Sequence, residues 1–378
     1  MDRAASPGLT LFLAGDVMTG RGVDQVLPHP GDPTLHETWV KDARGYVALA
    51  EEANGPISTP VEPAYVWGAA LAELDRVAPA ARIVNLETAV TTSDAFWPGK
   101  GIHYRMRPDN VSVLTAAGLD CCTLANNHVL DWGRAGLEET LGALHRAGLG
   151  TAGAGRDLWE ARSPAALEVP RAGGAGARVL VIAAATTTCG VPGSWEATER
   201  RSGVFLLPDP PERAAAAVRE ALESVRRPGD VAVASIHMGG NWGWEVPRSQ
   251  RRLARALIDE AGVDVVHGHS SHHVKGVEVH AGRLVLYGCG DLLTDYEGIG
   301  GREEYRGGLA LLYFPTLDPS TGALRSLEMT PVTTRRFRLE RCDREETRWL
   351  AETLTREGEP FGTGAETAPG GRLRLLWA

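Results

Sequence analysis

Short runs of β-branched and aliphatic residues alternate with longer segments of helical periodicity along most of this 378-residue chain. Each run is long enough for a single strand, and most of the segments between runs are long enough for a helix. Alternation of this kind requires crossover connections, and it predicts a largely parallel sheet in an α/β fold. The predicted strands are 9–14, 82–86, 120–124, 179–184, 231–236, 263–266, 284–287 and 307–314, and the predicted helices are 66–77, 111–117, 136–147, 211–225 and 249–261.

Six of the predicted strands end in polar side chains that can bind a metal ion or carry a proton. They are Asp16, Glu87, the pair Asn127 and His128, His237, the histidines of 267–273, and Asp291. Each has an ordinary structural explanation when taken alone, such as a turn, a helix cap or a buried histidine. Open α/β sheets bind ligands at the carboxyl ends of their strands, so together the six favour one functional crevice.

The segment 264–273 places four histidines, His267, His269, His272 and His273, directly after a β-branched run. Imidazole is a common ligand of divalent metals, and Gly268 allows the backbone to turn tightly between ligands. A solvated loop that happens to be rich in histidine is the alternative. The cluster predicts a divalent metal ion of unknown identity, and nothing in the chain indicates an organic cofactor.

The composition argues against several classes of partner. The formal net charge is -9 at pH 7 and no long basic run is present, so we expect neither a nucleic acid nor a membrane as partner. No apolar window approaches about 18 residues, and residues 1–8 lead into a strand without a signal peptide, so we expect a cytoplasmic protein. The five cysteines follow no metal-binding spacing, which favours core packing.

The oligomeric state is left open.

Two segments depart from the alternation. Residues 28–63 are rich in Pro, Gly and acidic residues, which predicts a long loop with a short helix that could act as a lid. After residue 335 the pattern weakens into a charged helix and a tail rich in Gly and Pro. We therefore predict one domain over residues 1–335 and a C-terminal helical appendage with a tail over 336–378.

Five motifs occur in a family-specific order. They are GDVMTGR at 15–21, NLE at 85–87, ANNHVLDWG at 125–133, HMG at 237–239 and GHSSH at 268–272. From about residue 9 to 315 the chain resembles the poly-gamma-glutamate capsule biosynthesis protein CapA family, a branch of the metallophosphoesterase-like superfamily. The resemblance implies a four-layer α/β/β/α sandwich, with two facing mixed β-sheets flanked by helices and a metal site at one edge.

The same resemblance implies roles for individual residues. The implied metal ligands are Asp16, Glu87, Asn127, His237, His269 and His272, and His128 is implied as a general acid or base. Two departures bear on the chemistry. The Asp-x-His motif of phosphoesterases is Asp16-Val17-Met18 here, and Asn241 replaces the glutamate of the His-Trp-Gly-x-Glu motif found in many relatives. Phosphoester hydrolysis at a two-metal site needs both ions, because together they stabilise the attacking and the leaving oxygen. These changes remove potential ligands and therefore disfavour phosphoester hydrolysis.

Three hypotheses about function follow. In the first, a metal ion polarises a peptide carbonyl, and His128 together with His237, His272 or Asp291 moves the Cα proton, as in the CapA-like peptide epimerases encoded with some lasso peptides. The substrate would then be a ribosomally made peptide. The second is metal-dependent hydrolysis of an amide or phosphoester bond. The third is a non-catalytic role in polyglutamate capsule synthesis.

Five further residues have predicted roles around this site. Arg21 and Lys275 could bind a substrate carboxylate, although Arg21 could instead form a salt bridge with Glu87 or Asp291. Trp132 and Trp242 could line a substrate groove, or they could simply pack over the site. Asp131 could orient His128 by a hydrogen bond, as carboxylates often do beside a functional imidazole.

Overall fold

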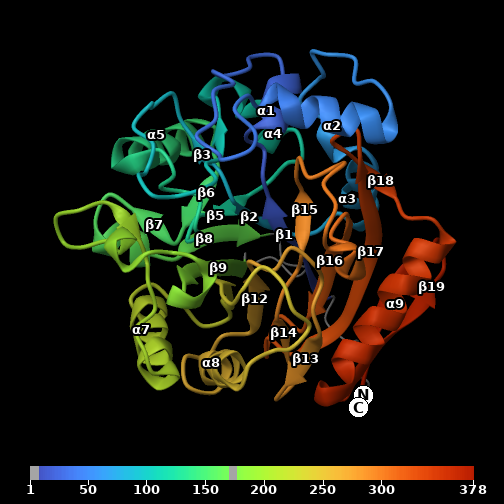
Figure 1. Cartoon of the computed structure of the whole chain (residues 1–378). Coiled ribbons are helices and arrows are strands. Elements are labelled where there is room, and N and C mark those ends of the chain that lie inside the picture. Colours follow the sequence, from blue (N-terminus) through green and yellow to red (C-terminus); the bar gives the residue numbers. More distant parts are fainter. Residues whose placement is uncertain (1–7, 170–176) are drawn as a thin grey trace.

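The computed structural model describes residues 8–169 and 177–378. Two β-sheets pack face to face, and helices cover their outer sides (Figure 1). This arrangement confirms the expected α/β sandwich with four layers. The helices are α1 (Gly22–Val26), α2 (Arg44–Asn54), α3 (Ala69–Val77), α4 (Ser112–Thr115), α5 (Gly133–Arg146), α6 (Leu158–Arg162), α7 (Pro211–Glu223), α8 (Arg248–Asp259) and α9 (Arg344–Gly358).

The first sheet has the strand order β19-β20-β17-β16-β1-β2-β5-β6, with β15 paired to β1 and β18 paired to β17. Its parallel part consists of β1 (Leu9–Val17), β2 (Ala81–Leu86), β5 (Cys121–Thr123), β6 (Gly150–Ala152) and β15 (Asp291–Leu293). Its antiparallel part consists of β16 (Leu309–Leu317), β17 (Leu324–Arg335), β18 (Arg338–Arg341), β19 (Thr363–Ala368) and β20 (Arg372–Trp377).

The second sheet has the order β13-β14-β12-β11-β9-β8. Its strands are β8 (Ala165–Val169), β9 (Ala177–Ala185), β11 (Val231–His237), β12 (Val265–His269), β13 (Val277–His280) and β14 (Arg283–Leu286). The four central strands are parallel, whereas β8 and β13 pair antiparallel at the edges. The prediction of a largely parallel sheet therefore holds for one half of the first sheet, β1-β2-β5-β6, and for the centre of the second. The other strands are antiparallel, and antiparallel strands can be added by hairpins without a crossover helix.

Alternate side chains along the strands of the second sheet belong to two different hydrophobic cores. Val179, Val181 and Val233 point into the core between the sheets. Leu180 and Ile182 pack in a second core with residues of α7 and α8. Successive side chains of a strand point to opposite faces, so the continuous apolar runs of β9 and β11 fit strands that are covered on both sides.

The remaining elements cover the first sheet or connect the strands. α3 and α5 contribute Leu74, Leu137 and Leu141 to the core that contains the first sheet. α2 lies within the predicted lid segment 28–63 and packs against α1. Short pairs of strands also form, namely β3 (Ala89–Val90) with β4 (Arg105–Met106) and β7 (Ala154–Gly155) with β10 (Gly203–Val204). The 3-10 turns are Tyr65–Trp67, Pro108–Asn110, Thr187–Cys189, Gly193–Trp195, Glu303–Tyr305 and Glu359–Phe361.

The C-terminal segment differs from the prediction. The charged helix exists as α9, which begins with a capping box between Asp343 and Glu346. The predicted tail is instead a hairpin of β19 and β20, and β20 pairs with β17 in the first sheet. Leu373 and Leu375 alternate with charged residues in β20 and are buried, which explains why a segment rich in Gly and Pro still forms a strand. The division of the chain at residue 335 stays a prediction.

Two expectations concern the whole chain. No helix within residues 8–169 and 177–378 is long and apolar enough to cross a membrane. The five cysteines are free thiols, and four of them are buried. Their burial fits the core-packing role expected from their spacing.

At Gly15, next to Asp16, the backbone of β1 lies very close to the backbone of Gly290, just before β15. A Cβ atom at this position would lie 1.7 Å from the carbonyl oxygen of Gly290, which accepts the Asp16 N–H. We expect Gly15→Ala to lower the free energy of unfolding by about 1–3 kcal/mol, because the backbone of β1 or β15 must move. Urea unfolding measures the change.

Gly193→Ala is the control for Gly15→Ala, because a Cβ atom there meets no other atom within 4 Å. Equal stabilities of the two variants would show that β1 and β15 do not approach as closely as described.

Candidate metal centre

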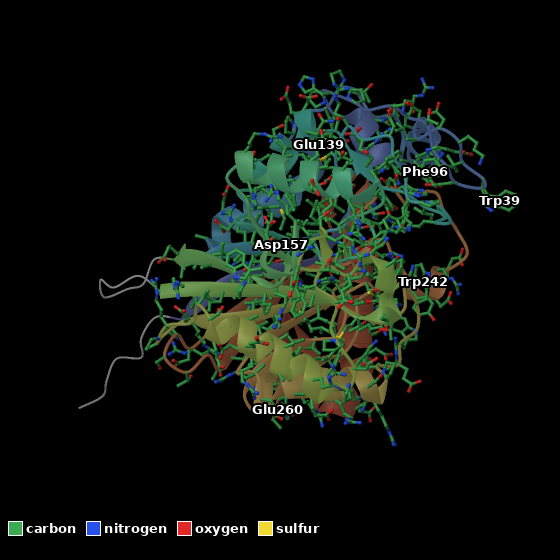
Figure 2. The ribbon with its side chains drawn as sticks, turned by 90° about the vertical axis from the view of Figure 1, so that its left-hand side faces the viewer. Trp39, Phe96, Glu139, Asp157, Trp242 and Glu260 are labelled. Carbon is green, nitrogen blue, oxygen red and sulfur yellow. The ribbon has the colours of Figure 1, made fainter. Side chains whose placement is uncertain are left out.

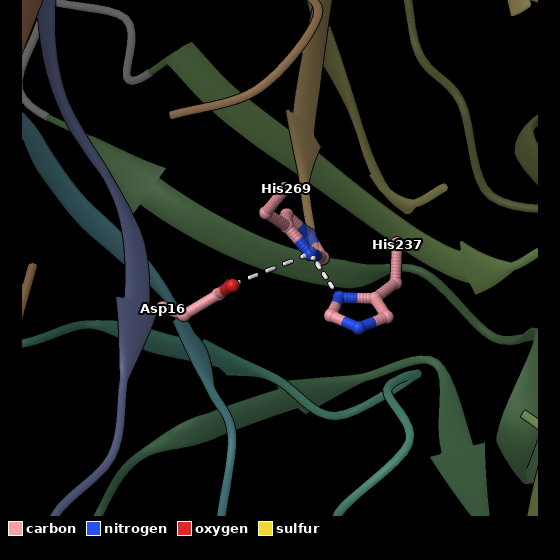
Figure 3. Close-up of side chains that lie close together, drawn as sticks. All are labelled: Asp16, His237 and His269. Carbon is pink, nitrogen blue, oxygen red and sulfur yellow. Dashed lines mark hydrogen bonds and ion pairs between the residues drawn. The ribbon is translucent and has the colours of Figure 1, made fainter. Parts of the chain in front are cut away.

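The carboxyl ends of strands from both sheets meet at one edge of the sandwich. In the first sheet Asp16 at the end of β1 is in register with Asn85 and Asp291. In the second sheet His237 at the end of β11 is in register with His269 at the end of β12. Figure 3 shows Asp16, His237 and His269 turned toward one another from the two sheets.

Two groups of potential ligands share the Asp16 carboxylate. One consists of Asp16, His237 and His269, and the other of Asp16, His272 and Asp291. Within each group the ligand atoms all lie within 4.8 Å of one another, and every residue is buried. Oxygen and imidazole ligands of this kind suit a divalent ion. The sequence-based argument that Met18 leaves a two-ion site incomplete overlooked the second group, because Asp291 reaches Asp16 only through the pairing of β15 with β1.

Hydrogen bonds to His267 and Ser235 fix the tautomer of His269. His267 Nε2 lies 2.8 Å from the Ala14 carbonyl oxygen, which can only accept, so Nε2 donates. Burial lowers the pKa of His267 to about 4, so its Nδ1 is unprotonated and accepts from the Ser235 hydroxyl 3.1 Å away. Ser235 Oγ must then accept from His269 Nε2 at 2.8 Å. The Nδ1 of neutral His269 is left as a free lone pair.

His237 presents the same nitrogen to the same point. Its Nε2 lies 2.9 Å from the amide oxygen of Asn127, which can only accept. Burial lowers the pKa of His237 and His269 well below the usual range, so both rings are neutral. Their unprotonated Nδ1 atoms are 2.8 Å apart, and Asp16 Oδ1 is 3.8 Å from His269 Nδ1. Two lone pairs and a carboxylate that converge in this way fit a cation.

The second group contains a buried oxygen that needs a partner. Asp291 Oδ1 accepts from His272 Nδ1 at 2.9 Å, whereas Asp291 Oδ2 is buried and has no hydrogen-bond partner among the described residues. An unsatisfied buried carboxylate oxygen is costly, and a bound cation would satisfy it. Burial alone would lower the pKa of His272, but the Asp291 carboxylate outweighs that effect and raises it.

Glu87 and Asn127 lie beside the two groups and belong to neither. Glu87 Oε1 is 3.7 Å from His128 Nε2 and 3.9 Å from His237 Nε2. Burial, together with the nearby Asp16, raises the pKa of Glu87 well above its usual range. Asn127 orients His237 through its amide oxygen. Their roles as metal ligands stay predictions.

His128, the predicted acid or base, lies next to the two groups. Its Nδ1 lies 2.6 Å from Asp131 Oδ2, as expected for an orienting carboxylate, and Asp131 Oδ2 also accepts the Tyr104 N–H. Burial lowers the pKa of His128 to about 4, so the ring is neutral near pH 7. His237 and Asp291, which were also predicted to carry protons, lie within the donor groups and fit ligand roles better.

Lys100 is a residue of this site that the sequence reasoning missed. Its ammonium group lies 2.9 Å from His128 Nδ1 and also contacts Asp131 and the Asn127 carbonyl oxygen. No local signal marks it, since Lys100 stands between Gly99 and Gly101 in a segment without strand or helix periodicity. Ser235 was missed as well, although it lies two residues before His237 and therefore on the same face of β11.

Arg21 is bound within the protein, and its role in substrate binding stays a prediction. Its guanidinium donates to Asp295 and to Glu37, and Nη1 also donates to the Tyr46 hydroxyl at 3.0 Å. The alternative to substrate binding was a salt bridge of Arg21 with Glu87 or Asp291. Salt bridges are present, but their partners are Asp295 and Glu37. Arg21 is 3% exposed, so a buried network occupies its donors and holds the segment after β1.

Two other predicted substrate contacts, Lys275 and Trp132, have partners within the protein. Lys275 is buried and donates to the Glu245 carbonyl oxygen at 2.9 Å. Trp132 is buried, donates to the Tyr104 carbonyl oxygen and packs under the Arg105 guanidinium. Neither residue lines the cleft described next, because both side chains point into packed regions, and their roles in substrate binding stay predictions. His273, the fourth histidine of the cluster, packs against Trp244 and Tyr305.

A cleft of about 710 Å³ opens beside the second donor group. His272 and Asp291 line it, and so does Trp242, whose contact with a substrate stays a prediction. The ring of Trp242 lies 5.3 Å from that of His272. Volumes in this range are typical of ligand-binding sites. Because His272 and Asp291 line the cleft, a molecule bound there can reach the second donor group.

The comparisons with known proteins agree with the resemblance of the motifs. The sequence profile described as "Bacterial capsule synthesis protein PGA_cap" matches residues 10–296. The chain is 46% identical to a Mycobacterium tuberculosis protein named "Probable polyglutamine synthesis accessory protein" over 369 residues, covering 97% of this chain and 96% of that protein. It is 28% identical over 288 residues to "PGA biosynthesis protein CapA" of Bacillus subtilis, covering 76% of this chain and 63% of that protein.

We expect the affinity for a divalent ion to rise with pH through neutrality. Burial and the neighbouring Asp291 raise the pKa of Asp16 to about 7, so below that pH a proton competes with the ion for the shared carboxylate. With one proton displaced, Kd should increase about ten-fold for each unit that the pH falls below 7. Calorimetric titration with Mn²⁺ or Zn²⁺ at several pH values measures the slope.

Asp16→Asn should weaken ion binding by at least about ten-fold and flatten the pH slope, because the shared ligand is lost. Asp75→Asn, at an exposed position on α3, is the matched control and should bind as the parent does. Unchanged binding in Asp16→Asn would show that the ion is held elsewhere.

Proposed function

The chain belongs to the bacterial capsule synthesis PGA_cap family, and from this premise we propose that it is an accessory protein in the synthesis of a polyglutamate-type polymer. In this role it binds the amide chain of the polymer at a divalent metal centre. The main support from the structure is that the two donor groups share Asp16 and that one group reaches the cleft through His272 and Asp291. The names of the relatives support the polymer as ligand.

The residues around the centre suit an amide chain. Carbonyl and carboxylate oxygens are ligands that divalent ions accept readily, and a bound ion would polarise such a carbonyl. His272 and Asp291 stand in the cleft wall, so a chain lying in the cleft passes next to the position where they would hold an ion. Trp242 offers an apolar surface for the aliphatic part of each residue of the chain.

Hydrolysis of the amide chain is the second candidate, and it is favoured by the arrangement of His128. The neutral imidazole lies next to Glu87 and donates through Nδ1 to Asp131, whose other carboxylate oxygen is paired with Lys100. Because the pKa of the ring is about 4, its Nε2 carries a free lone pair near pH 7 that can accept a proton from water. Such an activity would trim or release the polymer and would be compatible with an accessory role.

Peptide epimerisation, the first hypothesis drawn from the sequence, ranks below these two. It requires two proton carriers, one on each side of the Cα atom. His237, His272 and Asp291 all belong to the donor groups, which leaves His128 as the predicted carrier outside them. The names of the relatives refer to polymer and capsule synthesis and give this reaction no support. It stays a prediction that the following experiment also tests.

We expect the metal-loaded protein to bind oligomers of glutamate or glutamine, with affinity lost on chelation and at least about ten-fold weaker in Asp16→Asn, because the ion supplies part of the contact. Binding is measured by calorimetry, and the same mixtures are analysed by mass spectrometry in deuterium oxide. The proposal would be refuted if no oligomer bound. It would also be refuted if the affinity stayed the same after chelation and in Asp16→Asn.

The mass spectra separate the candidates. Shortened chains that disappear in His128→Asn would establish hydrolysis, and a gain of about one mass unit without cleavage would establish exchange of the Cα proton. Unchanged chains together with metal-dependent binding would leave the accessory role without catalysis. Asp75→Asn again serves as the matched control.

A further inference from the structure

Exposed apolar side chains gather around the cleft. Trp39, Ile102 and Ile299 are three of the large hydrophobic residues that are exposed among the described residues, and all three line the cleft. Trp39 is 92% exposed. Figure 2 shows it at the end of a projecting loop, with Trp242 below it on the same side of the molecule. Apolar groups collected at the mouth of a cleft indicate a binding surface.

The charged groups of the cleft are largely satisfied by the protein itself. Arg21 is bound to Asp295 and Glu37, and Arg306 lies 3.6 Å from Glu345. Glu297 accepts two backbone N–H bonds, from Arg336 and Phe337. Arg21 and Glu297 are therefore not available to pair with charges on a ligand, and the charge of Arg306 is shared with Glu345.

Arg302 is the exception among the charged lining residues. It is exposed, its guanidinium lies 5.6 Å from the centre of the Trp242 ring, and it forms no ion pair with a described residue. The lining as a whole contains three arginines and four carboxylates. The formal net charge of the chain is -9. Among the described residues, the cleft therefore has one arginine without an ion pair, Arg302, and no continuous row of basic side chains.

A row of carboxylates along a polymer would be poorly matched to this surface. Each charge would leave water for an apolar or acidic environment with a single arginine to compensate. A divalent ion at the donor groups would attract one oxygen at the floor of the cleft, and it would not neutralise the rest of a polyanion. Uncharged carboxamides avoid this cost, while their aliphatic stems can pack on Trp39, Ile102 and Ile299.

We propose that the cleft selects an amide chain whose pendant groups are uncharged carboxamides, as in polyglutamine, over one whose pendant groups are carboxylates. The inference rests on the proposed function, since it specifies which polymer of this class the same site binds.

The test compares four blocked pentapeptides that differ in pendant group and linkage. They are glutamine and glutamate chains in α-linked form, and the γ-linked chains with pendant carboxamides or carboxylates. Calorimetry on the full-length, metal-loaded protein should give a Kd at least about ten-fold lower for a carboxamide chain than for its carboxylate counterpart. Carboxamide binding should change less than about two-fold between low and high salt, because no charge pair carries it.

Two exposed tryptophans locate the binding surface. Trp39→Ala should weaken carboxamide binding about ten-fold, in the range of a tryptophan at the centre of an interface. Trp159→Ala is the matched control and should have an effect below about two-fold. Trp159 is 80% exposed and lines a separate groove with Leu158 and Arg162. Because both side chains are exposed, neither variant should disturb folding.

Three results would overturn the inference. Tighter, salt-sensitive binding of a carboxylate chain would mark the cleft as an anion site and would leave the proposed function standing. Equal losses in Trp39→Ala and Trp159→Ala would place the ligand outside the cleft. Failure of all four chains to bind would refute the inference together with the proposed function.

Discussion

The hydrogen bond from His267 to the Ala14 carbonyl oxygen joins the two sheets at the point where their strands end. Because Ala14 can only accept there, the proton of His267 is assigned, and the assignment passes through Ser235 to His269. The result is an unprotonated nitrogen facing Asp16 and His237. A residue that binds no ligand itself thus determines which atoms are available to do so.

The parts of the site that follow directly from a strand could be predicted from the sequence. Asp16, His237 and His269 come at the ends of continuous apolar runs, and the ends of parallel strands meet at one edge of a sheet. His128 and Asp131 are three residues apart, which brought them together as expected. The fold class could be predicted for the same reason, supported by the order of the motifs.

The parts that depend on loops could not be predicted. Lys100 reaches His128 from a connection without periodicity, and the partners of Arg21 come from positions 37 and 295, far from it in sequence. Asp291 was recognised as a polar strand end, but its place beside Asp16 depends on β15 pairing with β1. Local patterns carry no information about such long-range pairings, and the same holds for the C-terminal hairpin, which the sequence predicts as a tail and which depends on β20 pairing with β17.

The pairing of β1 affects the order in which the protein can form during synthesis. All strands of the second sheet lie between Ala165 and Leu286, so that sheet can assemble while later residues are still being translated. β1 leaves the ribosome first, yet Leu9 pairs with Leu317 and Asp16 with Asp291. Contacts so distant in sequence form slowly and late. A chain whose translation stops before Asp291 therefore lacks one of the two donor groups.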